Sequence, residues 1–177
     1  MTEDLRRLTA YHEAGHVVAH WALGIPFRYV TIRPRTGFGV WGSLRTYGIP
    51  QGVRKRLDVR EPRPRDLAQV EAHIVASLAG LAAEYRLLGI GHGPEYEAEA
   101  RDYADQCYSL ALLLSYPQAL PAEGARAYRD GLWLRSKGLV ADRWPAVEAV
   151  AMALLERGTL GAKDVARLAR EVGPSGA

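Results

Sequence analysis

The hydrophobic pattern predicts a first helix from about Glu3 to Leu23. Apolar side chains recur in this stretch at intervals of three and four residues, which is the spacing of one face of an α-helix. Gly24 and Pro26 follow the last apolar position, and both residue types end helices. The chain is therefore expected to open with an amphipathic helix.

The next pattern is that of short strands. The segments "FRYVTIRP" (27–34) and "FGVWGSLRTYG" (38–48) are rich in β-branched and aromatic residues and are separated by "RTG". This composition predicts a small hairpin or the edge of a small sheet. From residue 49 to residue 65 the composition changes to Pro, Gly and Arg, which predicts a long surface connection.

The rest of the chain has helical patterns. They predict helices at 66–88, with Asp66 as its cap, at 97–115, up to Lys137, from about Pro145, and at 161–173. We therefore expect a mostly α fold with one small β hairpin or sheet. One domain would span 1–177, with a first helix and β element in 1–50, a basic connection in 51–65 and a helical part in 66–177.

The composition limits which residues can hold a metal ion. The chain has 177 residues, is 48% hydrophobic and contains one cysteine, Cys107, so it can form no internal disulfide and no cysteine-based zinc knuckle. Any metal ion must be held by histidine and carboxylate. The first residues do not resemble a secretory signal, and the longest apolar run, "IVASLAGLAA", is too short to cross a bilayer. We expect a cytoplasmic protein with no membrane partner.

The net charge of +3 comes largely from arginines between Arg33 and Arg65. Such a cluster could contact an acidic surface or nucleic acid. Its densest part, 54–65, has no interleaved aromatic residues, and the chain has no recognisable nucleic-acid motif. A solvated arginine-rich loop is therefore the expected structure, and no nucleic-acid partner is predicted.

The sequence "HEAGH" at 12–16 carries the candidate chemistry. Residues four apart on a helix lie one turn above each other, so His12 and His16 can direct two imidazole nitrogens to one metal ion at about 2.1 Å. Glu13 lies about 100° round the helix and can reach a metal-bound water as a general base. This arrangement suits a hydrolytic zinc site. The small residues Ala14 and Gly15 leave room for another helix or a substrate.

The histidines of this helix also have a structural interpretation. His12 and His16 could be partly buried polar residues bonded to carbonyl groups. His20 continues the spacing, but it lies about 12 Å along the axis from His12, so we interpret it as a supporting residue. A third ligand is needed, and spacing alone does not choose among the candidates Glu84, Glu95, Glu97, Glu99, Asp102, Asp105, His73 and His92.

Three stretches resemble one family. "LTAYHEAGHVVAHWALGIPFRYVTIRPRTGFGVWG" is similar to the motif helix and following strand of the zinc peptidase domain of the FtsH family of ATP-dependent proteases. "SLAGLAAEYRLLG" is similar to the family's "GGRAAEExxxG" helix, and "VEAVAMALLERGTLGAKDVARL" to its C-terminal segment. The resemblance touches the beginning, middle and end of the chain, and it implies an FtsH-like, mostly helical peptidase fold.

The resemblance also implies site residues. The family's third zinc ligand is an aspartate, which corresponds here to Asp102 in "RDYADQCYSLA". The preceding gap is longer than the family's, so Asp105 and Glu99 stay open as substitutes. Glu84, in "AAEY", would accept the N–H of a ligand histidine and fix its tautomer; an ordinary surface charge is the other interpretation.

The expected function is that of a zinc metalloendopeptidase that acts on peptides or flexible protein segments, with Glu13 activating a metal-bound water. No "GxxxxGK[ST]" phosphate loop occurs in the chain, so this chain would work without ATP, as a homo-oligomer or with a separate ATPase partner. The alternative is a non-catalytic, zinc-stabilised protein-binding module descended from a peptidase.

Overall fold

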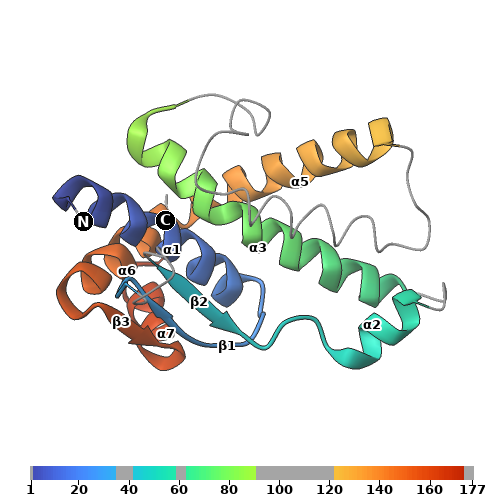
Figure 1. Ribbon diagram of the computed structural model, residues 1–177, viewed down its shortest axis with the longest axis horizontal. Helices are drawn as coiled ribbons and strands as arrows, with labels where there is room; N and C mark the ends of the chain where they lie inside the picture. Colours follow the sequence, from blue (N-terminus) through green and yellow to red (C-terminus); the bar gives the residue numbers. More distant parts are fainter. Residues whose placement is uncertain (1, 35–41, 59–62, 91–121, 174–177) are drawn as a thin grey trace.

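The computed structural model describes residues 2–34, 42–58, 63–90 and 122–173. Its helices are α1 (Glu3–Ala22), α2 (Gln51–Asp58), α3 (Pro64–Leu88), α5 (Ala122–Asp142), α6 (Trp144–Arg157) and α7 (Ala162–Val172). Its strands are β1 (Phe27–Thr31), β2 (Ser43–Thr46) and β3 (Thr159–Gly161). The fold is mostly helical with one small antiparallel sheet, as the sequence predicts (Figure 1). The helix predicted at 97–115 lies outside the described residues.

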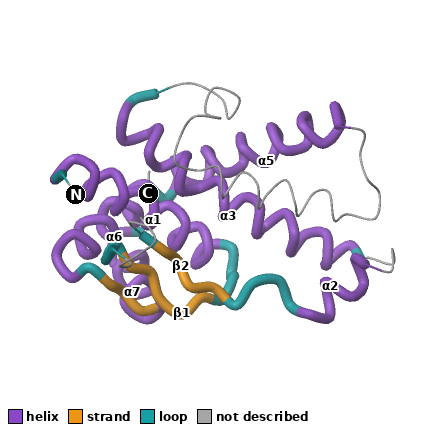
Figure 2. The backbone as a smooth tube through the Cα atoms, viewed as in Figure 1, coloured by secondary structure: helices purple, strands orange, loops and turns teal. Residues whose placement is uncertain are grey.

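Strand β1 is the centre of the sheet, whose order is β2-β1-β3 (Figure 2). Both neighbours run antiparallel to β1, and Val30 lies opposite Leu44 on one side and Leu160 on the other. Val30 is fully buried. The pairing of β1 with β2 contains an irregularity between Phe27 and Tyr29. The predicted hairpin strands are present, but the short strand β3 was not predicted from the sequence.

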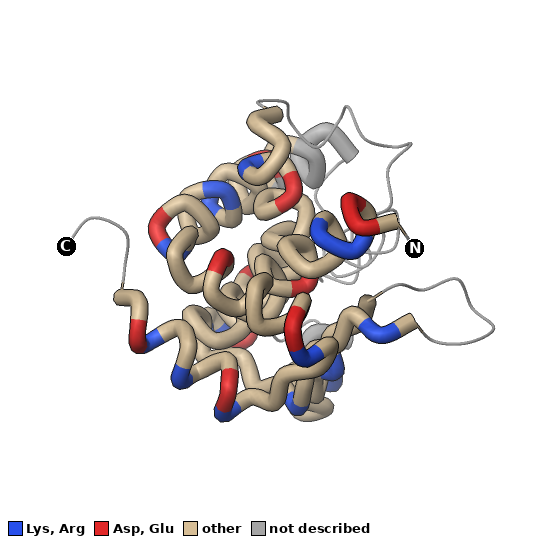
Figure 3. The backbone as a smooth tube through the Cα atoms, turned by 90° about the vertical axis from the view of Figure 1, so that its left-hand side faces the viewer, with Lys and Arg blue, Asp and Glu red and all other residues tan. Residues whose placement is uncertain are grey.

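Helix α7 packs on the sheet beside α6 and buries Val165 and Ala169. Its exposed side carries both signs of charge, visible in Figure 3 as red and blue positions along the helix that leads to the C-terminus. Two ion pairs lie here, Arg157 with Asp164 at 3.3 Å and Arg167 with Glu171 at 2.9 Å. Each positive charge in these pairs is therefore balanced locally.

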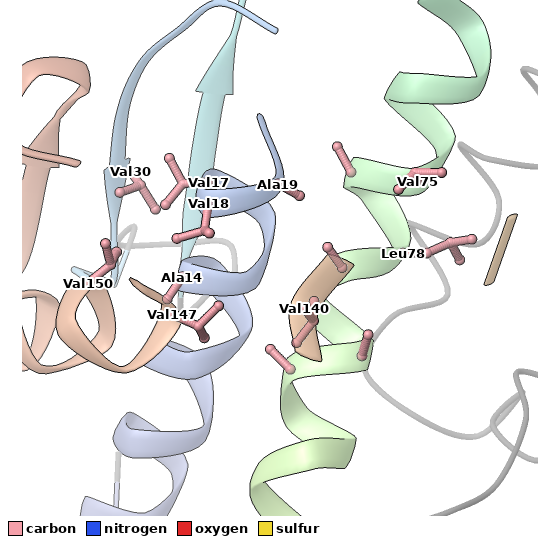
Figure 4. Close-up of a cluster of buried hydrophobic side chains, with 14 of the residues drawn as sticks. Ala14, Val17, Val18, Ala19, Val30, Val75, Leu78, Val140, Val147 and Val150 are labelled. Atoms are coloured by element: carbon pink, nitrogen blue, oxygen red, sulfur yellow. The ribbon is translucent and has the colours of Figure 1, made fainter. Parts of the chain in front are cut away.

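Helix α1 occupies the middle of the molecule. It packs between α3 on one side and α6 with the sheet on the other (Figure 4). Every residue from Thr9 to His20 except His12 is buried, which a helix with only one apolar face would not allow. Valines such as Val17 and Val18 fill the side toward β1 and α6, and α3 covers the other side.

The segment predicted to be a connection contains helix α2. Ile49 and Val53 bury their side chains against the core. Arg56 donates two hydrogen bonds to Asp66, at 2.6 and 2.7 Å. The sequence did not predict this helix, because two buried apolar residues give too weak a periodic signal to indicate a helix of eight residues.

Helix α3 begins two residues before its predicted start. Pro64 is its first residue, and Asp66, predicted as the cap, accepts a hydrogen bond from the backbone N–H of Arg63 at 2.9 Å. The Arg56 guanidinium holds the pKa of this buried carboxyl well below its usual range. Helix α5 continues past the predicted end at Lys137 to Asp142.

Among the helices of the described ranges, none is both long enough and apolar enough to serve as a membrane span.

Helices α1 and α3 run antiparallel at very close approach. A methyl group added at Gly15 would collide with the backbone oxygen of Ala79 and lie 2.8 Å from the Cβ of Ala83. Real carbon atoms do not approach each other so closely, so glycine is required at this position. Gly15 was expected to leave room for another helix, and that helix is α3.

We predict opposite effects of two glycine-to-alanine substitutions. Gly15→Ala should lower the free energy of unfolding by about 1–3 kcal/mol, because the added methyl group overpacks the α1–α3 contact. Gly131→Ala is the matched control, since nothing lies within 4 Å of its added methyl group; it should raise the stability by up to about 1 kcal/mol through helix propensity. Urea unfolding of both variants measures this, and a stabilised Gly15→Ala would contradict the close contact.

Candidate metal centre

The two histidines of "HEAGH" face each other on α1. Their Nε2 atoms lie 2.9 Å apart, and their rings are nearly perpendicular at 86° with centroids 4.5 Å apart. The helix produces this meeting because residues four apart project from the same side. The structure therefore brings together the predicted pair of metal ligands.

The other ring nitrogen of each histidine is directed to an acceptor on α3. The Nδ1 of His16 lies 2.9 Å from the backbone oxygen of Ala76. Since a carbonyl oxygen can only accept, His16 must carry its hydrogen on Nδ1. The Nδ1 of His12 lies 3.4 Å from Oε1 of Glu84, and a carboxylate favours a hydrogen on that nitrogen too.

With the hydrogen on Nδ1 in both rings, each Nε2 would keep a lone pair. Two lone pairs at 2.9 Å repel each other unless a proton or a metal ion lies between them. Two Zn–N bonds of about 2.1 Å at a tetrahedral angle would place the nitrogens about 3.4 Å apart. A change of about half an ångström in side-chain position would therefore admit the ion, so this histidine pair fits a shared zinc.

Glu13 lies beside the pair and is buried. It packs against Gly42, immediately before β2, where an added methyl group would lie only 2.5 Å from the Oε1 of Glu13. The absence of a side chain at Gly42 thus lets the start of β2 approach the carboxylate. Glu13 is held between α1 and the edge of the sheet.

Gly80 on α3 approaches the imidazole rings themselves. A methyl group there would lie 2.5 Å from Nε2 of His16 and 2.7 Å from Cε1 of His12. Gly80, Gly42 and the carbonyl of Ala76 were not predicted from the sequence. The signal that could have found Gly80 is the row of small residues at helical spacing in "ASLAGLAA", which matches Ala14 and Gly15 on α1.

His20 and His73 form a separate, buried pair. Their ring centroids lie 6.2 Å apart, and the Nδ1 of His20 lies 2.9 Å from the backbone oxygen of His16. Burial lowers the pKa of His73, and the positive charge of Arg54 lowers it further. The structure thus keeps His73 with His20 and does not join it to the pair formed by His12 and His16.

The third ligand stays a prediction. Asp102 and its substitutes Asp105 and Glu99 lie outside the described residues, as do Glu95, Glu97 and His92. Within residues 2–34, 42–58, 63–90 and 122–173, no group of three His, Cys, Asp or Glu side chains is assembled to hold a metal ion. The remaining candidate, Glu84, is placed against His12.

Comparison with known proteins indicates a distant relationship. No protein-family model matches the chain. The chain is 26% identical over 201 residues to the ATP-dependent zinc metalloprotease FtsH of Magnetococcus marinus, and the match covers 95% of this chain. It covers only 28% of the relative. The match supports a metallopeptidase-related origin, while the ATP-dependent activity of the whole relative does not transfer from so small a part.

We predict that Gly80→Ala weakens zinc binding. The added methyl group would displace one or both rings, and a change in ligand orientation typically costs about 10- to 100-fold in metal affinity. Competition with a chromogenic chelator at fixed pH measures this affinity, with Gly131→Ala as the control. Unchanged affinity in Gly80→Ala would contradict the placement of the metal between these rings.

Proposed function

We propose that this chain is a zinc-dependent metallopeptidase that hydrolyses peptide bonds in peptides or flexible protein segments. The observation that carries the proposal is the convergence of His12 Nε2 and His16 Nε2, 2.9 Å apart, with buried Glu13 between them in sequence. The distant match to a zinc metalloprotease supports the same chemistry.

The chain's own residues would divide the work as follows. His12 and His16 would hold the ion, with Asp102 as the third ligand. Bound there, Zn²⁺ would supply Lewis acidity toward a water molecule and the substrate carbonyl. Glu13 would accept the proton of the attacking water on its carboxylate and deliver it to the leaving amide nitrogen.

Helix α3 would keep both ligands in position. The backbone oxygen of Ala76 would fix the orientation of His16, and the carboxylate of Glu84, 3.4 Å from Nδ1 of His12, would do the same for His12. Hydrogen bonds of this kind raise the basicity of a ligand histidine and select its tautomer. The close approach of α1 and α3 thus serves the chemistry as well as the packing.

The edge of the sheet is where we place the substrate. Strand β2 pairs with β1 on one side, and no strand of the described part of the chain pairs with its other side. An extended peptide could add there as a further strand. Because Gly42 lies against Glu13, a residue paired near the start of β2 would present its carbonyl close to the general base. A separate ATPase partner would be needed for folded substrates.

Replacing the general base should separate binding from catalysis. We expect Glu13→Gln to retain one zinc per chain, because it removes no ligand, and to lose about 10²- to 10⁴-fold in casein cleavage. Glu148→Gln is the matched control, since Glu148 is exposed on α6; it should cleave as wild type does. Metal analysis and a fluorescent casein assay measure both quantities.

Two outcomes contradict this mechanism. Full cleavage by Glu13→Gln would remove Glu13 from the reaction. Zinc bound by wild type without cleavage of casein would favour the non-catalytic binding module.

Replacing the third ligand should change metal binding first. We expect Asp102→Ala to lose more zinc affinity than the roughly 10- to 100-fold typical of an outer hydrogen-bonding partner. Asp105→Ala and Glu99→Ala are the matched comparisons and should keep their affinity. If Asp102→Ala binds zinc as tightly as wild type and either comparison loses it, the ligand is the residue in that comparison.

A further inference from the structure

Exposed positive charges lie on β1, on β2 and on the following helix α2. Four exposed basic residues lie there, which we call the basic strip: Arg28, Arg45, Arg54 and Lys55. The guanidinium of Arg28 covers one face of the Tyr47 ring and lies 5.0 Å from its centroid. A terminal nitrogen of Arg54 lies within 3.6 Å of a methyl group added at Gly48. Arg28 and Arg54 therefore both lie beside residues 47–48, which connect β2 to α2.

Among the residues that the structure describes, no acid forms an ion pair with the basic strip. In the described ranges, no carboxylate lies within ion-pair distance of Arg54 or Lys55. Asp66, which follows α2, is only 1% exposed and is fully engaged by Arg56. Arg157 and Arg167, in contrast, are each paired with an acid of α7 (Figure 3).

The strip continues the edge strand that leads away from Glu13. Gly42, at the start of β2, contacts Glu13, and Tyr47 follows the last residue of the strand. Five residues of extended chain span roughly 16 Å. A peptide paired along β2 with its scissile bond near Gly42 would therefore place a residue about five positions away beside Tyr47 and the basic strip.

We propose that the basic strip binds acidic side chains of the substrate four to six residues from the scissile bond. The inference rests on the proposed function and adds a substrate class to it. An acidic peptide fits better than nucleic acid, because one face of the exposed Tyr47 ring is covered by Arg28 and stacking on bases needs open aromatic faces.

Two measurements test the proposal. Cleavage sites in casein, mapped by mass spectrometry, should be enriched in Asp and Glu four to six residues to one side of the cut, and Arg54→Glu/Lys55→Glu should lose this enrichment. Separately, zinc-loaded Glu13→Gln should bind a labelled peptide with four consecutive glutamates about tenfold more tightly than the same peptide with glutamines at low salt. Adding Arg54→Glu/Lys55→Glu should abolish the difference.

The control carries the same change in charge elsewhere. Lys163→Glu/Arg170→Glu alters two exposed residues of α7 and should keep both the enrichment and the tenfold preference. All variants should keep the thermal midpoint of wild type within a few degrees, which shows that they are folded.

The outcomes separate the two proposals. No cleavage by wild type would overturn the proposed function. The binding measurement with the labelled peptides would still decide whether acidic peptides bind. Cleavage without acidic enrichment, together with equal binding of the two peptides, would overturn the role of the strip alone. A single-stranded oligonucleotide of four negative charges that binds as tightly as the glutamate peptide would overturn the peptide proposal in favour of a nucleic-acid surface.

Discussion

The approach of α3 to α1 is the constraint on which the candidate centre depends. Gly15 allows the backbone of α3 near Ala79 to touch α1, and Gly80 allows α3 to pass beside both imidazole rings. A glycine within a helix costs about 1 kcal/mol relative to alanine. Glycine at these two positions allows the close approach that brings the carbonyl oxygen of Ala76 within 2.9 Å of Nδ1 of His16. The distance between α1 and α3 therefore also sets the orientation of the histidine rings.

The composition of this helix pair differs from that of an ordinary core. Glu13, His16, His20, His73 and Glu84 are all less than 10% exposed. Buried polar groups need hydrogen-bond partners and otherwise reduce stability. An interface selected for stability alone would hold apolar side chains, as the opposite side of α1 does at Val17 and Val18. Conflict with the local rules of packing is typical of functional positions.

The sequence predicted α1 within one residue because its apolar positions are strongly periodic and Gly24 follows directly. It also indicated His12, Glu13 and His16, since helical spacing alone brings the two histidines together. It did not indicate α2 or β3, whose positions depend on contacts with distant residues such as the Arg56–Asp66 ion pair and the pairing of Leu160 with Val30. Gly80 was missed for the same reason: its role exists only when α3 lies on α1.

The distribution of charge connects the centre to the surface around it. A net charge of +3 is small for 177 residues, and the acids of α7 pair with Arg157 and Arg167. In the described part of the chain, Arg28, Arg45, Arg54 and Lys55 have no ion pair, and Asp66 is already engaged by Arg56. Positive charges without acidic neighbours repel each other, and the binding of an acidic partner relieves this repulsion. Because this surface follows the strand that begins beside Glu13, an extended acidic chain paired along β2 would contact the positive charges and Glu13 together.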